Sequence, residues 1–225
     1  MLGNGKNTER PHTHAEINEY RRKALIEGTI KSLSEHGVGG TTVRSICAEA
    51  GSSRGLIGHY FESKEHLLEA AFRHLYTTVA NHVVKAQKKA GEDPHAKLLA
   101  LPQSVFSSAV FTPLIRNAFL TFWHEIRFNP LVREANREVY GEYLHRTELL
   151  FSQASKERGL EINPKQAAIG LITMIDGLWL SLSIYDRLTS RESAVATCQQ
   201  FIDLQLGAGP GERADGMAEQ DRDKA

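Results

Sequence analysis

The sequence predicts an all-α protein with about nine helices. Apolar residues recur at three- and four-residue spacing, which is the period of one face of an α-helix. No run of residues alternates apolar and polar side chains with the period of two that a half-buried strand requires. Prolines, glycines and capping residues punctuate the pattern, and a chain of 225 residues with 41% apolar content is long enough to bury a substantial core.

Three helices are predicted in the first part of the chain. The first runs from about Ile17 to a stop near Gly37, and the second begins after Thr42, a good N-cap residue. Gly51 ends the second helix, and Ser53 is placed to cap a third, shorter one. Two short helices joined through a glycine form a helix-turn-helix, because the turn needs a residue that tolerates positive φ.

A long connecting helix and a larger helical region are predicted next. Ser63 is placed to cap a helix that runs to about Gly91. Proline stands at or next to the start of three later helices, where its fixed φ and missing N–H are tolerated. The later helices are expected over residues 95–109, 113–128, 130–158, 165–186 and 191–206.

Composition and periodicity divide the chain into four segments. Residues 1–15 and 207–225 are polar or rich in small and charged residues without helical periodicity, so we expect a disordered N-terminal arm and a disordered tail. Between them we expect a three-helix domain over residues 16–62 and a larger helical domain over residues 63–206.

One stretch, residues 167–185, is long and apolar enough to resemble a membrane span. Asp176 lies in its middle, where insertion into a bilayer would cost about 2.5–3.5 kcal/mol. No second span accompanies it. We therefore expect a helix that is apolar on most faces because protein surrounds it, and no membrane association.

Charge and cysteine content indicate a cytoplasmic protein. The 27 basic and 27 acidic residues give a formal net charge of zero, which excludes a polybasic protein but not a local basic face. Cys47 and Cys198 each lie in an apolar helical pattern, typical of buried thiols in a reducing compartment rather than of a disulfide or metal site. The N-terminus lacks the apolar stretch of a signal peptide.

The sequence shows no enzyme signature. A nucleophile elbow, an HExxH zinc motif, paired catalytic carboxylates and a phosphate loop are not found. The histidines offer no metal site either: His12 and His14 fall in the N-terminal arm, and His66, His74 and His82 step eight residues apart and so drift around a helix. We expect no catalysis, cofactor or metal, and keep a helical enzyme and a purely structural adaptor as rival classes.

Residues 41–71, TTVRSICAEAGSSRGLIGHYFESKEHLLEAA, resemble the DNA-binding domain of TetR-type repressors. The resemblance lies in the glycine turn, the short helix ending in His-Tyr-Phe, and the Ser-Lys-Glu opening of the next helix. Residues 21–37, 117–134 and 175–180 further resemble the choline-responsive, BetI-type subgroup of that family. The subgroup controls the glycine-betaine pathway.

The resemblance implies a cytoplasmic homodimer that binds a near-palindromic operator and is released by a small-molecule inducer. In this family the last two helices, here within residues 165–206, pair across the dimer. Residues 63–206 would then form the ligand-binding and dimerisation domain. Choline or a related quaternary ammonium is the expected inducer. The alternative is a TetR-type repressor of another regulon, for efflux or for lipid or xenobiotic catabolism, with a hydrophobic ligand.

The third helix and its flanks supply the expected DNA contacts. Arg54 is the candidate for a base edge, since a guanidinium bridges guanine O6 and N7, and glycines at 55 and 58 would let the backbone approach the groove. Ser52, Arg54 and Gly58 depart from the family pattern. Residues 17–64 hold seven basic and five acidic side chains, a net charge of +2. The resemblance marks Thr42, Tyr60 and Lys64 as positions that contact phosphate. The full set of expected DNA contacts is Thr42, Ser53, Arg54, Gly55, Gly58, His59, Tyr60 and Lys64.

Aromatic rings and one acid in the larger domain suggest a cation site. A quaternary ammonium has no N–H to donate, so a cage of rings with a carboxylate nearby suits it. Asp176 is the acid inside an apolar helix. Rings at helical spacing are also common in cores, and pairing of Asp176 across a dimer is the alternative role for this acid. The expected ligand contacts are Phe119, Phe122, Trp123, Tyr140, Tyr143, Asp176 and Trp179.

Overall fold

The computed structural model describes residues 13–185 and 189–207, and every regular element in those ranges is a helix, which confirms the all-α prediction. Most of the two segments predicted to be disordered, residues 1–12 and 208–225, lies outside the described residues. The helices are α1 (His14–Gly40), α2 (Val43–Ala50), α3 (Arg54–Tyr60), α4 (Lys64–Lys89), α5 (Pro94–Val105), α6 (Pro113–Phe128), α7 (Pro130–Glu157), α8 (Pro164–Ile184) and α9 (Arg191–Gln205).

Helix α1 begins at His14, three residues earlier than expected, so the first turn uses residues assigned to the N-terminal arm. A capping box explains the difference. The Thr13 hydroxyl accepts from the Glu16 N–H at 3.2 Å, and the Thr13 N–H donates to the Glu16 carboxylate at 3.0 Å. The predicted stop at Gly37 is a break with φ 63°, after which the helix continues to Gly40.

The helix-turn-helix packs tightly on α1. Gly51 joins α2 to α3 in the left-handed conformation, with φ 59° and ψ 36°, as the turn prediction requires. Thr42 caps α2 in a capping box with Ser45. Gly28 of α1 lies so close to Ala50 of α2 that a Cβ at residue 28 would stand 2.8 Å from the Ala50 backbone nitrogen. The two helices therefore touch along their backbones.

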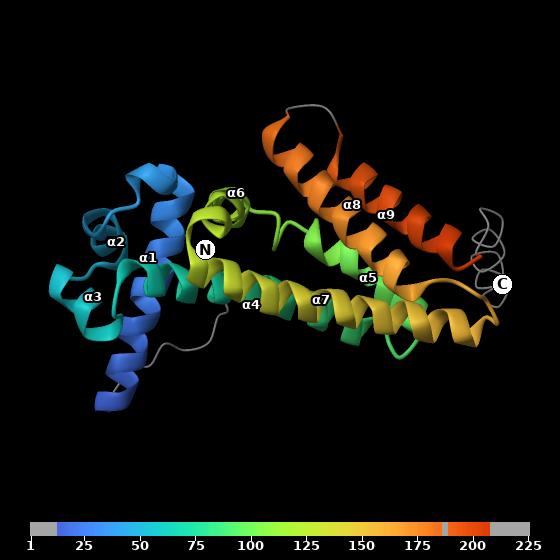
Figure 1. Cartoon of the computed structure of the whole chain (residues 1–225), viewed down its shortest axis with the longest axis horizontal. Coiled ribbons are helices and arrows are strands. Elements are labelled where there is room, and N and C mark those ends of the chain that lie inside the picture. The colour runs from blue at the N-terminus through green and yellow to red at the C-terminus, as the bar shows by residue number, and fades with distance from the viewer. Residues whose placement is uncertain (1–12, 186–188, 208–225) are drawn as a thin grey trace, which may run out of the picture.

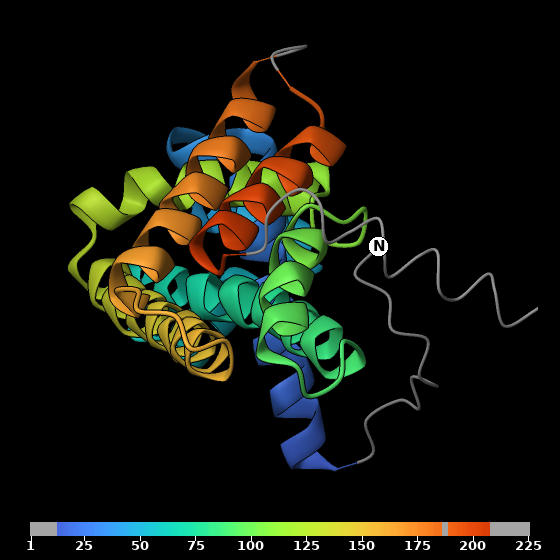
Figure 2. The same ribbon diagram turned by 90° about the vertical axis from the view of Figure 1, so that its right-hand side faces the viewer.

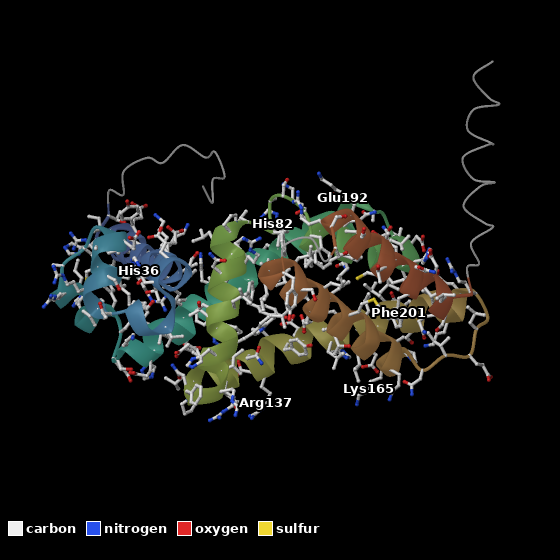
Figure 3. The ribbon with its side chains drawn as sticks, turned by 90° about the horizontal axis from the view of Figure 1, so that it is seen from above. His36, His82, Arg137, Lys165, Glu192 and Phe201 are labelled. Carbon is white, nitrogen blue, oxygen red and sulfur yellow. The ribbon has the colours of Figure 1, made fainter. Side chains whose placement is uncertain are left out.

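The long helices α4 and α7 run side by side along the molecule (Figure 1). Helices α2 and α3 form one end, and α8 and α9 lie towards the other. Figure 2 shows α8 and α9 side by side above α7 and α5. The ring of Phe201 on α9 approaches the backbone of Gly170 on α8, where a Cβ would lie 2.7 Å from the Phe201 ring (Figure 3). Helix α6 packs against α1 and so joins the two parts of the chain.

Helix α8 is only partly surrounded by its own chain. It is the described helix long and apolar enough to cross a membrane, by length and composition alone, and 33% of its most apolar stretch is buried. Ile169, Leu180 and Ile184 on α8 are exposed. Within a single copy of the chain, protein therefore covers only one face of α8, which meets the expectation in part. The other face of α8 is apolar and exposed.

Replacing Gly28 by Ala is expected to lower the free energy of unfolding by about 1–3 kcal/mol, the usual range for overpacking. The new Cβ would meet Ala50 backbone and side-chain atoms at 2.8–3.0 Å. Helix propensity alone predicts a gain of about 1 kcal/mol. Urea unfolding distinguishes the two, with Gly141→Ala on α7 as the control, because a Cβ there meets nothing within 4 Å. A stabilised Gly28→Ala variant would contradict the packing described.

Candidate functional site

Helix α3 presents one face to solvent and buries the other. Ile57 is buried, whereas Arg54, Gly55, Gly58 and His59 are exposed. A Cβ built at either glycine meets nothing within 4 Å, so this face of the helix is bare backbone beside the Arg54 side chain. No ion pair joins Arg54 to an acid among the described residues, and its guanidinium stays available to a partner.

Two of the expected phosphate contacts already hold intramolecular hydrogen bonds. The Tyr60 hydroxyl donates to Oδ1 of Asn18 on α1 at 2.9 Å, and the His59 and Tyr60 rings meet edge to face at 4.7 Å. Tyr60 was expected to donate to phosphate, and here its proton goes to Asn18. The Lys64 ammonium donates to the Thr41 carbonyl at 2.5 Å and keeps two further N–H groups.

Ser53 occupies the N-cap position of α3 but makes no side-chain cap bond, contrary to expectation. The Leu56 N–H instead donates to the Ser53 carbonyl at 3.1 Å, so the backbone closes this short helix. The Thr42 hydroxyl does cap its helix and is exposed. Both hydroxyls lie on the solvent side of the helix-turn-helix.

A cavity of about 640 Å³ lies among α4, α5, α6, α7 and α8. Six of the seven residues expected to contact a ligand line it: Phe119, Trp123, Tyr140, Tyr143, Asp176 and Trp179. Phe122 does not line the cavity. It is fully buried and packs edge to face on Phe72 of α4, with ring centroids 5.3 Å apart. Figure 3 shows α6, which carries Phe119 and Trp123, between the N-terminal helices and α8.

The carboxylate of Asp176 faces a group of tyrosines inside this cavity. The Tyr140 hydroxyl donates to Asp176 Oδ2 at 2.8 Å. Burial raises the pKa of the Asp176 carboxyl above its ordinary value, and the hydrogen bond from Tyr140 offsets part of that rise. Burial, together with the neighbouring carboxylate, also raises the pKa of Tyr76 and Tyr140. The tyrosines therefore stay neutral and surround one acidic group.

Further aromatic side chains lie in and behind the cavity wall. The Trp179 ring meets Phe111 edge to face at 4.6 Å and Phe119 at 6.0 Å between centroids. The Trp179 indole N–H is buried without a hydrogen-bond partner among the described residues. Tyr76 of α4 was not predicted from the sequence, although it lines the cavity and contacts Phe119. Tyr76 precedes Val79, another lining residue, by three positions, and this helical spacing is the signal that could have placed it on this face.

A second group of polar side chains lies at the end of α1 and on α2. Ligand atoms of Glu35, His36 and Glu49 lie within 4.8 Å of one another, a geometry that could hold a metal ion. The sequence analysis did not consider this group. Glu35 and His36 are exposed, and acidic groups of this kind often meet on a surface without an ion. The group is far less enclosed than the cavity.

Two family models match the chain and divide it as the helices do. The model of bacterial regulatory proteins of the tetR family matches residues 25–71, which hold the helix-turn-helix. The model of the C-terminal domain of BetI-type transcriptional repressors matches residues 94–207, half of the chain. The chain belongs to the tetR family. Its larger domain is of the BetI type, and proteins of this family are transcriptional regulators rather than enzymes.

Individual relatives of this tetR-family chain agree over nearly their whole length. The transcriptional regulator BetI of Burkholderia cenocepacia strain HI2424 is 30% identical over 192 residues, covering 85% of this chain and 97% of the relative. A solved transcriptional regulator from Pseudomonas aeruginosa PAO1 is 31% identical, with a TM-score of 0.76 over 84% of this chain and 92% of that one. A Saccharomonospora viridis regulator, solved in complex with choline, shares the fold at 21% identity, with a TM-score of 0.72 over 82% and 96% of the two chains.

Ser52 departs from the tetR-family pattern, and nothing in the structure explains the serine. The family usually has a small apolar residue after the turn glycine. Here the Ser52 hydroxyl is buried and has no hydrogen-bond partner among the described residues. The position is therefore apolar in character, and a hydroxyl left unpaired there costs stability.

Asp176→Asn is expected to stabilise the ligand-free protein at neutral pH. The folded pKa of Asp176 is raised, so the cost of burying its charge is absent below the ordinary pKa of 3.8 and grows as pH rises through the folded pKa. Asn removes that charge and keeps an oxygen acceptor for the Tyr140 hydroxyl. Thermal unfolding measures the difference, which should shrink as pH falls towards 3.8.

The exposed carboxylate of Glu142 provides the control, because it lines the same cavity while its side chain stays 63% exposed. Glu142→Gln should leave that pH dependence unchanged. A stabilisation by Asp176→Asn that is equal at neutral and acid pH would show that burial of the charge is not its cause.

Proposed function

We propose that this chain is a ligand-responsive repressor that binds a near-palindromic operator as a cytoplasmic homodimer and is released by choline or a related quaternary ammonium. In this proposal it controls glycine-betaine synthesis. The observation that carries it is one buried carboxylate, Asp176, surrounded by tyrosine rings in an aromatic cavity of a BetI-type domain. The names of the Burkholderia relatives and the choline bound to the Saccharomonospora regulator support the same ligand class.

At the operator, the exposed face of α3 enters the major groove. Arg54 contacts a base edge, because a guanidinium can donate two hydrogen bonds to guanine. The bare backbone at Gly55 and Gly58 lets α3 lie close to the bases. Thr42, Ser53, His59 and Lys64 contact phosphates, which fix the register without reading the sequence. Tyr60, the remaining expected phosphate contact, also has a positioning role, since its hydrogen bond to Asn18 ties α3 to the start of α1.

Arg54→Ala and Lys64→Ala should have different effects on DNA binding. Loss of Arg54 should relax specificity at one base pair and cost about 1–3 kcal/mol on the preferred operator. Loss of Lys64 should weaken binding to all sequences alike and reduce the slope of log affinity against log salt by about one. Fluorescence anisotropy with operator and scrambled duplexes measures both. Unchanged operator affinity in both variants would refute this docking.

Pairing through α8 and α9 is the dimer arrangement that we propose. Ile169, Leu180 and Ile184 on α8 and Leu204 on α9 are exposed in the single chain, and together they form an apolar face on adjacent helices. Burial of such a face is the usual driving force for a stable dimer. The pair presents two copies of α3, as a twofold operator requires. Sedimentation at twice the 25.0 kDa chain mass supports this arrangement, and sedimentation at 25.0 kDa excludes it.

Recognition of the inducer relies on charge and ring faces rather than on donors. A quaternary ammonium is attracted to the negative faces of aromatic rings within about 6 Å, and a desolvated contact of this kind is worth about 2 kcal/mol. Asp176 supplies the opposite charge, and Tyr140 holds that carboxylate in place. Burial makes the Asp176 charge costly in the empty cavity, so a bound cation removes a penalty that the free protein bears.

Helix α6 is placed to transmit ligand binding to the DNA-binding end. It carries Phe119 and Trp123 in the cavity, and its outer side contacts α1. The Thr121 hydroxyl donates to the Leu33 carbonyl at 3.2 Å, and the Asn117 amide donates to the Ser34 carbonyl at 3.5 Å. We propose that ligand favours a position of α6 and the long helix α4 in which the two heads lose their operator spacing.

Calorimetry with choline tests the proposed function. Choline should bind the intact chain and release it from operator DNA, whereas the neutral isostere with carbon in place of the quaternary nitrogen should do neither. Asp176→Asn should weaken choline binding by about tenfold or more, a loss of about 1.4 kcal/mol, since it removes the opposite charge that faces the buried cation. Glu142→Gln is the matched control at the exposed side of the cavity. If choline neither binds nor releases DNA at millimolar concentration, the choline assignment fails.

The alternative function is repression of another regulon, for efflux or for lipid or xenobiotic catabolism. It shares the fold and the DNA-binding face and differs in the ligand. The size of the cavity is the observation in its favour, because choline fills only part of it.

A further inference from the structure

The cavity is much larger than choline. Choline has seven non-hydrogen atoms, and liquid water allots about 30 Å³ to each molecule with one such atom, so choline needs at most about 200 Å³. The cavity measures about 640 Å³, within the range of sites that bury drug-sized ligands. A choline molecule beside Asp176 would leave more than half of this space to water.

The remaining space is elongated along α4 and α7. The lining spans Phe72 to Gln87 on α4 and Asn136 to Leu150 on α7. Asp176 and Tyr140, which hydrogen-bond to each other, lie about one helical turn from the first end of the α7 lining. Beyond them the lining continues from Tyr76 to Gln87 and from Tyr140 to Leu150, which at 1.5 Å per residue is about 15–16 Å of each helix. The cavity therefore continues for two to three helical turns beyond the acidic group.

The far part of the cavity is apolar. Val83 and Leu101 are buried there, and Leu150 lines the same part. Its polar side chains are already bonded to the protein: the Gln87 amide donates to the Lys97 carbonyl at 3.3 Å, and the Thr147 hydroxyl donates to the Tyr143 carbonyl at 2.9 Å. The lining thus offers hydrocarbon surface and no unpaired charge to whatever fills this part.

Charged side chains in the lining are found near the solvent. Arg146 and Glu142 form an ion pair at 2.9 Å, and their side chains are 59% and 63% exposed. Both belong to α7, and Thr77 and Asn81, which line the same cavity on α4, are exposed as well. The cavity is therefore open to solvent on the side where these residues of α4 and α7 lie, close to Tyr76 and Tyr140.

We propose that the inducer is a cationic amphiphile, with a quaternary ammonium head at Asp176 and an unbranched apolar chain of about ten carbons along Val83, Leu101 and Leu150. The proposal rests on the cation site of the proposed function and extends it to a longer ligand. The chain length follows from the geometry: of the roughly 16 Å of lining beyond Asp176, the ammonium head takes about 4 Å, and the remaining length of about 12 Å holds about ten carbons at roughly 1.2 Å per bond. The two parts of the ligand match the two parts of the lining, acidic and aromatic at one end and aliphatic at the other.

Calorimetry with a series of alkyltrimethylammonium ions, each below its micelle concentration, tests this proposal. Affinity should rise about fourfold for each methylene buried, the ratio that corresponds to about 0.8 kcal/mol, and should level off near ten carbons. Leu150→Phe should make the rise stop at a shorter chain, while tetramethylammonium affinity stays as in the wild type. Leu149→Phe is the matched control, because Leu149 is the neighbouring residue on α7, 47% exposed and outside the cavity.

The outcomes separate this proposal from the proposed function. If choline binds and longer ions bind no better, the amphiphile proposal is overturned and the choline assignment stands. If long-chain ions bind and choline does not, the choline assignment fails and the amphiphile proposal stands. If neither ion binds and a neutral alcohol of equal chain length does, both are overturned.

Discussion

Helix α1 has to pack against α2, α4 and α6 at once, and the proposed coupling between ligand binding and DNA binding depends on that constraint. Contact with α2 requires the absence of a side chain at Gly28. Contact with α6 uses backbone carbonyls of Leu33 and Ser34, which are available because the helix breaks soon afterwards at Gly37. Because α1 contacts both helices, a movement of α6 would be passed to α2 by α1 as a rigid body rather than by a flexible linker.

The acidic group of the cavity illustrates how a residue placed to bind a ligand, as proposed for Asp176, reduces the stability of the fold. A carboxylate buried among rings raises its own pKa and penalises the folded state when it is ionised. The hydrogen bond from Tyr140 offsets only part of that penalty. Perturbed groups of this kind concentrate at binding sites, where a ligand supplies the missing countercharge. The neutral tyrosines around Asp176 serve the same end, because they add ring faces without competing charge.

Local signals predicted the fold well, and tertiary contacts account for what was missed. Gly51, Thr42 and the prolines at helix starts gave the helix-turn-helix and most helix boundaries, because caps and turns act within a few residues. The capping box at Thr13 is equally local and was overlooked. The bond between Tyr60 and Asn18 joins residues 42 positions apart, and no sequence pattern predicts it.

Some residues that line the cavity were predicted from the sequence and others were missed. Phe119 and Trp123 lie four residues apart and share a face of α6, whereas Phe122 lies about 100° around the helix from Trp123 and faces the core instead. Ring content alone could not separate these positions. The aliphatic half of the cavity gave no signal at all in the sequence, because Val, Leu and Thr at helical spacing are also what an ordinary core contains.

The outward apolar face of α8 makes the stability of the protein depend on its concentration in the cell. A helix that is apolar on a face uncovered by its own chain is unfavourable in water, so under the proposed pairing the folding of each copy and its association with a second copy form one linked equilibrium. The stability of such a chain then rises with its own concentration. At low copy number, dilution of a chain of this kind would increase the unfolded fraction that proteases remove.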